Sequence, residues 1–540
     1  MGDPAGRSRT AATALTVVLV LAIIGLPLVR LASVAFEDGP GGLAAALGGP
    51  LAGRAILNSI WTATLVTMLA VLIGTAAAFV TERSATSGRS ILRAGILSPL
   101  LVPPFVVAFG WTRAFGPRGL SDQLLGIELP GLFGPIGIVL VVTVAATPLV
   151  WLVVAASLAS RLEPDLDLAA RASGAGRVRT FVTVSLPLLR PGLLAAAVVT
   201  FVYAINAFGV PAILGSPAGF PTITTRLYQD LAFSSSPAAF ARATALATTL
   251  VVLVVVTVGS ADALLTGRTT RRTGATGTLT PPGQGSRWPI ALLLGGIVLT
   301  TVIPLIAVTL TALTSAVGLP PVPENWTLAN FGLALGDGRF GGALARSLIL
   351  AAGAATLVLI LGGLVAAGTR GGRVAGTVLA LGFAVPGSAL AVAVLLAYGG
   401  ALRDTVLIIL IAYVAKFWAL GHRQLSGSLD RLPEELIRAA RVSGASPATT
   451  LRTIVAPILR PSILAAWAIV FIFGLHELTM SSLLYGPETS TLAVHVLNVQ
   501  QLGDPTVSAA LAVILTLLVG AAAVPLLLLG RRSASFAPTM

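Results

Sequence analysis

Cysteine and lysine are nearly missing from this chain. Its 540 residues include no cysteine, which excludes disulfides, thiolate nucleophiles and cysteine-based zinc sites. The single lysine is Lys416, within Ala415-Lys416-Phe417. A phosphate-binding P-loop needs lysine between glycine and serine or threonine. The chain therefore does not bind nucleotide through a P-loop of its own.

Charge is also scarce. Charged residues make up 10% of the chain, against roughly a quarter in an ordinary soluble protein. Apolar residues make up 56%, and the mean hydropathy is +0.95. These values exclude a single soluble domain and a disordered chain. They indicate many membrane spans of roughly 20 residues each.

Twelve apolar runs are long enough, or nearly so, to cross roughly 30 Å of hydrocarbon as helices. The alternating pattern of a β-barrel is not seen. Residues 266–287 are rich in Gly, Thr, Pro and Arg and are typical of a linker. We therefore predict an all-α membrane protein with twelve transmembrane helices, as two six-span repeats at 1–265 and 288–532. The runs lie near Ala11–Leu31, Asn58–Val80, Leu92–Phe115, Ile136–Leu158, Pro191–Leu214, Ala241–Leu265, Trp288–Ser315, Leu344–Ala367, Val374–Tyr398, Thr405–Leu420, Ser462–Leu484 and Thr506–Leu529.

The arginines divide unevenly between the two sides of these spans. With a cytoplasmic N-terminus, 24 arginines fall on the cytoplasmic side and nine on the outer side or at outer span ends. This bias follows the positive-inside rule and places both termini in the cytoplasm. It also accounts for the net charge of +14 without nucleic acid as a partner. Lys416, near the inner end of a span, is expected to snorkel to the inner surface.

The two halves contain a repeat. Leu166–Ala196 and Leu436–Ala466 align without a gap, are identical at 16 of 31 positions, and are offset by 270 residues. Elsewhere the correspondence is looser: Asn58-Ser59 lies opposite Arg346-Ser347, and Pro103 opposite Pro386. Each copy follows the fourth span of its half, so both copies are cytoplasmic and have the same orientation. This is a parallel repeat with a pseudo-two-fold axis along the membrane normal.

Each repeated segment predicts a short helix on the membrane surface that docks into a partner. A proline, Pro164 or Pro433, precedes a stretch that is compatible with a helix and has a small, smooth face. A glycine then ends that helix. A second amphipathic stretch leads to a further proline at the start of the next span. The alternative is an ordinary interfacial loop, but two copies at half-length spacing favour docking. The docking residues are Ala169, Ala170, Arg171, Gly174 and Pro187 in the first copy, and Ala439, Ala440, Arg441, Gly444 and Pro457 in the second.

These two loops resemble the signature of binding-protein-dependent ABC transporter permeases, Glu-Ala-Ala, three residues, Gly, nine residues, Ile-x-Leu-Pro. The glutamate position holds Leu168 in one copy and Arg438 in the other, and Ala456 replaces the leucine before proline in the second. The resemblance implies a permease subunit that is not an enzyme and binds no cofactor. Two copies of a cytoplasmic ABC ATPase would dock on the loops and hydrolyse ATP. An extracytoplasmic binding protein would deliver the substrate to a bacterial inner membrane.

The segments FVYAINAFGVPAILG and FIFGLHELTMSSLLYGPETSTLAVHVLNVQ resemble those of fused twelve-span ferric-iron importer permeases. Relatives of that group carry thiamine, phosphonates or sugar phosphates, so these substrates stay open. An ion-gradient-driven secondary transporter is a further alternative, because that class also has parallel repeats. It would leave the repeated loop without a role. A membrane enzyme would need a cluster of His, Asp or Glu with ligand spacing, which the sequence lacks.

Two ionisable residues, His476 and Glu477, lie inside the predicted eleventh span, and such groups suggest function. Their counterparts in the fifth span are Asn206 and Ala207, with Tyr203 three residues before. The resemblance implies that the fifth span of each half lines the central path, which makes Tyr203, Asn206, His476 and Glu477 candidates. The alternative is a structural cluster in which His476 and Glu477 satisfy each other or lie at the outer interface. One His-Glu pair is a poor iron cage, so we predict no metal site.

The predicted topology can be tested by labelling, since the chain has no native cysteine. We expect single cysteines at Arg83, Arg171, Arg271, Arg370 and Arg441 to resist a membrane-impermeant maleimide in intact cells and to react after the cells are opened. Labelling of any of these positions from outside would contradict the orientation.

Overall fold

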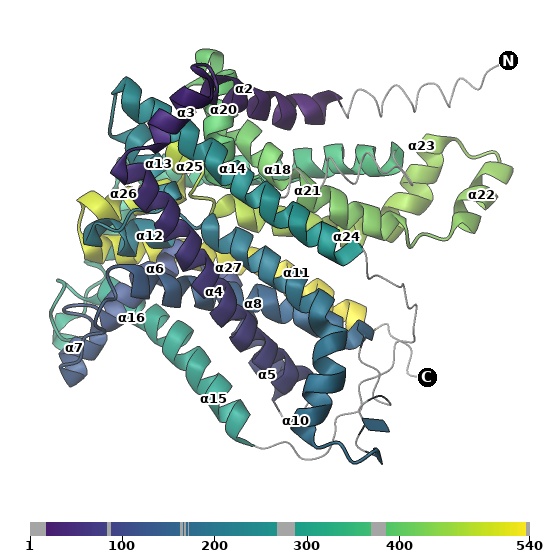
Figure 1. Cartoon of the computed structure of the whole chain (residues 1–540), viewed down its shortest axis with the longest axis horizontal. Coiled ribbons are helices and arrows are strands. Elements are labelled where there is room, and N and C mark those ends of the chain that lie inside the picture. Colours follow the sequence, from purple (N-terminus) through teal and green to yellow (C-terminus); the bar gives the residue numbers. More distant parts are fainter. Residues whose placement is uncertain are drawn as a thin grey trace.

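The computed structural model describes residues 18–83, 88–161, 166, 169–170, 172–266, 287–368 and 385–535. Helices dominate this part of the chain (Figure 1). The first half contains η1 (Leu21–Gly25), α2 (Leu26–Ala35), α3 (Gly39–Leu47), α4 (Pro50–Arg83), α5 (Arg89–Leu97), η2 (Ser98–Leu101), α6 (Pro104–Phe115), α7 (Leu120–Leu125), α8 (Pro135–Arg161), α10 (Arg177–Thr180), η3 (Phe181–Ser185), α11 (Leu186–Ile205), α12 (Gly209–Leu214), η4 (Ser216–Ala218), α13 (Ile223–Ala232) and α14 (Pro237–Thr266).

The second half repeats much of this order. It contains α15 (Arg287–Ile297), η5 (Val298–Val302), α16 (Ile303–Leu313), η6 (Pro323–Asn325), α17 (Ala329–Gly336), α18 (Gly338–Gly368), α20 (Gly387–Leu402), α21 (Val406–Leu429), α22 (Glu434–Val442), α23 (Pro447–Thr450), η7 (Leu451–Val455), α24 (Ala456–Leu475), α25 (Ser481–Leu484), α26 (Leu492–Leu502) and α27 (Pro505–Ser535). The segments α10, η3 and α11 and their counterparts α23, η7 and α24 begin and end at positions 270 residues apart.

Ten of the twelve predicted spans are long apolar helices in the described part of the chain. The third span of each half differs from the prediction. The first of these is a pair of segments, Arg89–Leu101 and Pro104–Leu125, bent by 103°. Val102 stands before Pro103 and has extended backbone angles, φ −105° and ψ 127°, as a residue before proline prefers. The prolines at this point of the sequence therefore account for the bend.

In the second half, the predicted span Val374–Tyr398 lies partly outside the described residues. The described helix there, α20, has 16 residues, slightly short of a full crossing. Pro386 caps it with φ −58° and ψ 136°, and Pro103 caps α6 with φ −54° and ψ 131°. The predicted correspondence of these two prolines is confirmed. The predicted linker, 266–287, lies almost wholly outside the described residues.

Wide π-helical turns precede a proline in four spans. At each turn the last N–H bonds to the carbonyl five residues back, as from Leu186 to Phe181. Proline has no N–H and its ring crowds the preceding turn, so the helix widens there rather than breaking. The prolines that follow η1, η3, η5 and η7 are Pro27, Pro187, Pro304 and Pro457.

The first span of each half packs on the third span of the other half. In Figure 1, α2 lies beside α20, and α16 lies beside α6. The Trp111 indole N–H donates to the Thr300 carbonyl at 3.0 Å, and the Tyr398 hydroxyl donates to the Ala22 carbonyl at 2.8 Å. Both carbonyls lie in π turns, four or five residues before a proline that supplies no N–H. Aromatic donors of one half thus satisfy backbone acceptors of the other.

A matching pair of hydrogen bonds fixes the second span of each half to a short helix, α13 or α26. The Ser59 hydroxyl accepts from the Ile223 N–H at 2.8 Å, and the Ser347 hydroxyl accepts from the Leu492 N–H at 2.8 Å. Ile223 and Leu492 are the first residues of α13 and α26, whose N–H groups have no partner within the helix. The residues just before these two serines make a second matching pair of bonds, each 2.9 Å long. The Asn58 amide donates to the Pro221 carbonyl, and the Arg346 guanidinium donates to the Ser490 carbonyl.

Candidate coupling loops and translocation path

Both repeated loops end their first helix in the same way. Gly444 has φ +76° and Gly174 has φ +83°, a left-handed conformation that glycine adopts at little cost. The Ala445 N–H bonds to the Ala440 carbonyl, and the Ala175 N–H to the Ala170 carbonyl, both at 3.0 Å. This six-to-one bond is the Schellman arrangement, which ends a helix sharply.

The second loop is largely exposed. Its helix α22 has Ala439 exposed, Ala440 buried and Arg441 in the last turn, where a cation favours the helix dipole. Val442 is 89% exposed, an apolar side chain that no described part of the chain covers. In Figure 1, α22 and α23 lie at the right-hand end of the molecule, and α10 of the first loop lies at its lower edge.

The structure describes most of the remaining loop residues. Ala169 and Ala170 precede Gly174, while Arg171 lies outside the described residues. Pro187 and Pro457 stand in the first turn of α11 and α24. Arg438, which replaces the signature glutamate, pairs with Glu434 at 2.6 Å on the exposed face of α22. That pair stays within the helix, and exposed pairs of this kind contribute little to stability.

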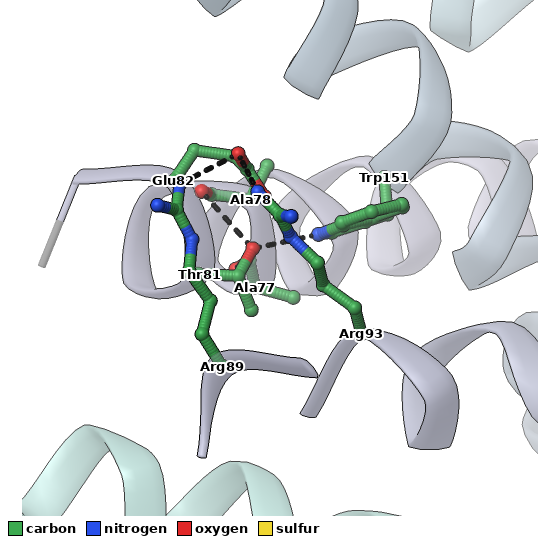
Figure 2. Close-up of polar contacts among 7 residues, drawn as sticks. All are labelled: Ala77, Ala78, Thr81, Glu82, Arg89, Arg93 and Trp151. Carbon is green, nitrogen blue, oxygen red and sulfur yellow. Dashed lines mark hydrogen bonds and ion pairs between the residues drawn. The ribbon is translucent and has the colours of Figure 1, made fainter. Parts of the chain in front are cut away.

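The segment that follows the first loop packs on the C-terminal end of α4, the second span. The Phe181 ring, in η3, meets the Phe79 ring of α4 edge-on, with centroids 5.3 Å apart. Figure 2 shows the neighbouring polar contacts, in which the Glu82 carboxylate forms ion pairs with the guanidinium groups of Arg89 at 2.8 Å and Arg93 at 2.6 Å. Beside them, the Trp151 indole of α8 donates to the Thr81 hydroxyl at 2.9 Å. Sequence reasoning missed Glu82, although a lone acidic residue among cytoplasmic arginines was a signal for it.

The fifth span of each half breaks at matching positions. α11 ends at Ile205 and α24 at Leu475, so the predicted spans Pro191–Leu214 and Ser462–Leu484 are too long at their C-terminal ends. Asn206 and His476 are the residues that follow. The Asn206 amide donates to the Val202 carbonyl at 2.7 Å. Buried atoms of both residues, Asn206 Oδ1 and His476 Nδ1, have no hydrogen-bond partner.

Glu477 caps the short helix that follows the second break. Its carboxylate accepts from the Met480 N–H at 2.8 Å, the Ser481 N–H at 3.0 Å and the Ser481 hydroxyl at 3.0 Å. The Ser481 hydroxyl also meets the Tyr413 hydroxyl at 2.7 Å. These groups, rather than His476, satisfy the carboxylate. Mutual pairing of His476 with Glu477, one form of the structural alternative, is therefore wrong.

Lys416 also differs from the prediction. Its ammonium donates to the Val385 carbonyl at 2.7 Å, and Val385 is buried. Lys416 interacts electrostatically with Glu477 as well. It is held inside the protein and does not snorkel, because the carbonyl before Pro386 lies outside any helix and accepts the bond.

The two breaks meet between the halves. A Cβ atom on Gly209, just after the first break, would lie 2.7 Å from Phe105 Cβ and 3.3 Å from Leu478 Cδ2 of the second half. Phe105, Phe208 and Leu478 are buried in one apolar core, against which Tyr203 of α11 packs. A nearby cavity beside Ala207 has about 10 Å³, room for no more than one water. The two breaks are thus in direct apolar contact across the boundary between the halves.

No group of three His, Cys, Asp or Glu residues that could hold a metal ion occurs in the described ranges.

The family of binding-protein-dependent transport system inner membrane components matches residues 70–268 and 358–530. The chain belongs to this family. Its two matched regions contain the two coupling loops and both broken spans. The chain is thus a membrane permease with a duplicated transport domain.

Similar permeases match either most of this chain or about a third of it. The ferric transport system permease protein FbpB of Actinobacillus pleuropneumoniae is 26% identical over 89% of this chain and 72% of its own length. A probable ABC transporter permease of Sinorhizobium fredii is 25% identical over 97% of this chain and 95% of its own. A probable molybdenum ABC transporter permease of Haloferax volcanii is 35% identical over 37% of this chain and 73% of its own.

Replacing Gly174 and Gly444 tests the docking role of the loops. Open space surrounds both glycines, so Gly174→Val and Gly444→Val add backbone strain of about 1–2 kcal/mol each without a clash. We expect the double variant to insert normally but to lose roughly tenfold or more in ATPase docking and in transport. Gly176→Val, in the same loop at ordinary backbone angles, is the matched control. Normal transport by the double variant would rule out docking through these caps.

Glu477→Gln tests the cap in the second break. A neutral amide loses charge-assisted bonds to backbone N–H groups, so we expect a destabilisation of about 1–3 kcal/mol, seen as a lower melting temperature of the purified permease. Glu488→Gln, at an exposed loop position, should change stability by less than about 0.5 kcal/mol. Equal melting temperatures for the two variants would contradict the capping role.

Proposed function

We propose that this permease imports ferric iron across a bacterial inner membrane, driven by two copies of a cytoplasmic ABC ATPase and supplied by an extracytoplasmic binding protein. The observation that carries the proposal is the likeness to a fused ferric permease over 89% of the chain. Two transport domains in one chain provide both docking loops, so one copy of the chain would serve each transporter. The hydrolysed ATP stays on the partner subunits.

The proposed division of the chain follows the repeat: a first permease repeat at 1–265, a cytoplasmic linker at 266–287 and a second repeat at 288–532. Both termini would be cytoplasmic, and membrane lipid would surround the spans. Support comes from the arginine bias. Under this orientation, Val442 and its neighbours on α22 face the ATPase.

The proposed path runs between the halves, along the pseudo-two-fold axis. Tyr203 and Asn206 of the first half and His476 and Glu477 of the second would line it on either side of the breaks. The contact of Leu478 with Gly209 would close it. Because the chain has no P-loop, ATP can act on this contact only through movement of the docking loops. The ring contact Phe181–Phe79 joins one loop to the second span, so movement of the loop would be transmitted to that span.

Molybdenum is the second candidate substrate, because the permease of Haloferax volcanii has the higher identity, 35%. That likeness covers 37% of this chain, about one transport domain, whereas the ferric likeness covers both. The two substrates also differ in charge, since ferric iron is a cation and oxidised molybdenum in water is an oxyanion. A transport assay can therefore separate them.

The proposal is tested by purifying the tagged chain from its native host and identifying what copurifies. We expect an ABC ATPase and a binding protein. In proteoliposomes with these partners, ATP should drive uptake of radiolabelled ferric citrate and not of molybdate. ATP-driven uptake of molybdate alone would replace iron by molybdenum. Recovery of the chain without any ATPase, with uptake driven by a proton gradient, would overturn the importer itself.

A further inference from the structure

A small polar cavity lies between the two halves. It has about 30 Å³ of space, and its walls come from α6 and α7 of the first half and from α16 and residues 316–321 of the second. In Figure 1, α7 and α16 lie at the left of the molecule, away from α22 of the second docking loop at its right. With the docking loops in the cytoplasm, the cavity faces the outside. Its polar lining includes Arg113, Arg118, Gln123, Thr311 and Thr314.

Arg113 brings an uncompensated charge to this cavity. Its guanidinium carbon lies 5.6 Å from the centroid of the buried Phe109 ring, and its Nε is buried without a hydrogen-bond partner. No ion pair in the described part of the chain includes Arg113 or Arg118. A partly desolvated guanidinium without a counter-charge is costly, so an anion placed there would be stabilised.

The other cavity groups hold the loop and leave the guanidinium groups for a ligand. The Arg118 N–H donates to Asp122 at 2.9 Å, and the Gln123 amide donates to the Arg118 carbonyl at 2.9 Å. These bonds keep Arg118 at φ +56°, a conformation that costs a non-glycine residue about 1–2 kcal/mol. The Thr311 and Thr314 hydroxyls donate to carbonyls of their own helix. The two guanidinium groups are thus charged donors to the cavity with no ion-pair partner in the described part of the chain.

We propose that this cavity receives an aspartate or glutamate side chain of the extracytoplasmic binding protein. The inference rests on the proposed function. A cavity of about 30 Å³ has room for roughly two waters, which suits the three heavy atoms of a carboxylate better than a bulkier lipid phosphodiester. A guanidinium also matches a carboxylate in a planar, two-bond geometry. An acidic side chain seated here contacts both halves, so binding-protein docking would depend on their relative position.

The test measures the Kd of the purified binding protein, recovered with the transporter as above, for the permease–ATPase complex in nanodiscs at low and high salt. Arg113→Gln should raise Kd about tenfold or more and remove much of its salt dependence. The Kd of Arg113→Lys should lie between those of the wild type and Arg113→Gln, because lysine keeps the charge but lacks the planar guanidinium that makes two bonds. Arg118→Gln, at an exposed position, should also raise Kd without disturbing the fold.

Arg403→Gln is the matched control, an exposed arginine outside the cavity with the same loss of charge, and it should leave Kd nearly unchanged. Unchanged Kd and salt dependence in folded Arg113→Gln and Arg118→Gln would overturn the inference. So would loss of copurified anionic phospholipid, seen by native mass spectrometry, with no change in Kd, because a lipid phosphate would then be the occupant. A wild-type complex that binds no binding protein would instead contradict the proposed function.

Discussion

Backbone hydrogen bonding in an apolar surrounding constrains the whole structure. Inside hydrocarbon an unpaired N–H or carbonyl costs several kcal/mol, so every interruption of a span needs its own partner. Proline creates such interruptions at Pro27 and Pro304. The Tyr398 hydroxyl and the Trp111 indole satisfy the carbonyls Ala22 and Thr300 that these prolines leave free. Because each donor comes from the opposite half, the same bonds that repair the helices also join the halves.

The breaks in the fifth spans follow the same constraint with different partners. In the second half a carboxylate, Glu477, accepts from the N–H groups of Met480 and Ser481. In the first half the matching position is Ala207, whose carbonyl accepts from the Thr224 hydroxyl at 2.6 Å. The duplicated domains thus keep the break and differ in how its polar groups are satisfied. The Glu477 carboxylate at the second break has no counterpart at Ala207, which makes the two sides of the proposed path chemically unequal.

Coupling by movement suits this arrangement. The loops are rigidly ended by glycine at Gly174 and Gly444, and the first one bears on the second span through the Phe181–Phe79 contact. At the same inner end, Glu82 holds Arg89 and Arg93 of α5. Gly95 of α5 approaches Ile297 of the second half, where an added Cβ would lie 2.9 Å from Ile297 Cδ1. Packed contacts therefore connect the first docking loop with both halves of the molecule.

Composition and repetition determined much of this protein at the level of sequence. The low charge, the twelve apolar runs and the 270-residue offset predicted a helical membrane protein with a duplicated domain, because hydropathy and the spacing of repeats are local properties that survive without coordinates. Glycine in both loops predicted the helix ends for the same reason: a left-handed residue is a local requirement. The family match confirmed the class of protein.

Other features depended on residues distant in sequence, and only the tertiary structure decided them. The third span was predicted as one helix, and the structure bends it by 103°, although Pro103 marked the place. Lys416 was expected to snorkel, and it bonds instead to the Val385 carbonyl, 31 residues away. The sequence left Glu477 with two possible roles, as a path residue or as a structural residue. Its cap on α25 depends on the break in the fifth span, which only the structure shows. A hydrophobic run specifies that a segment enters the membrane. The partners that satisfy its polar groups are chosen by packing, which no single run contains.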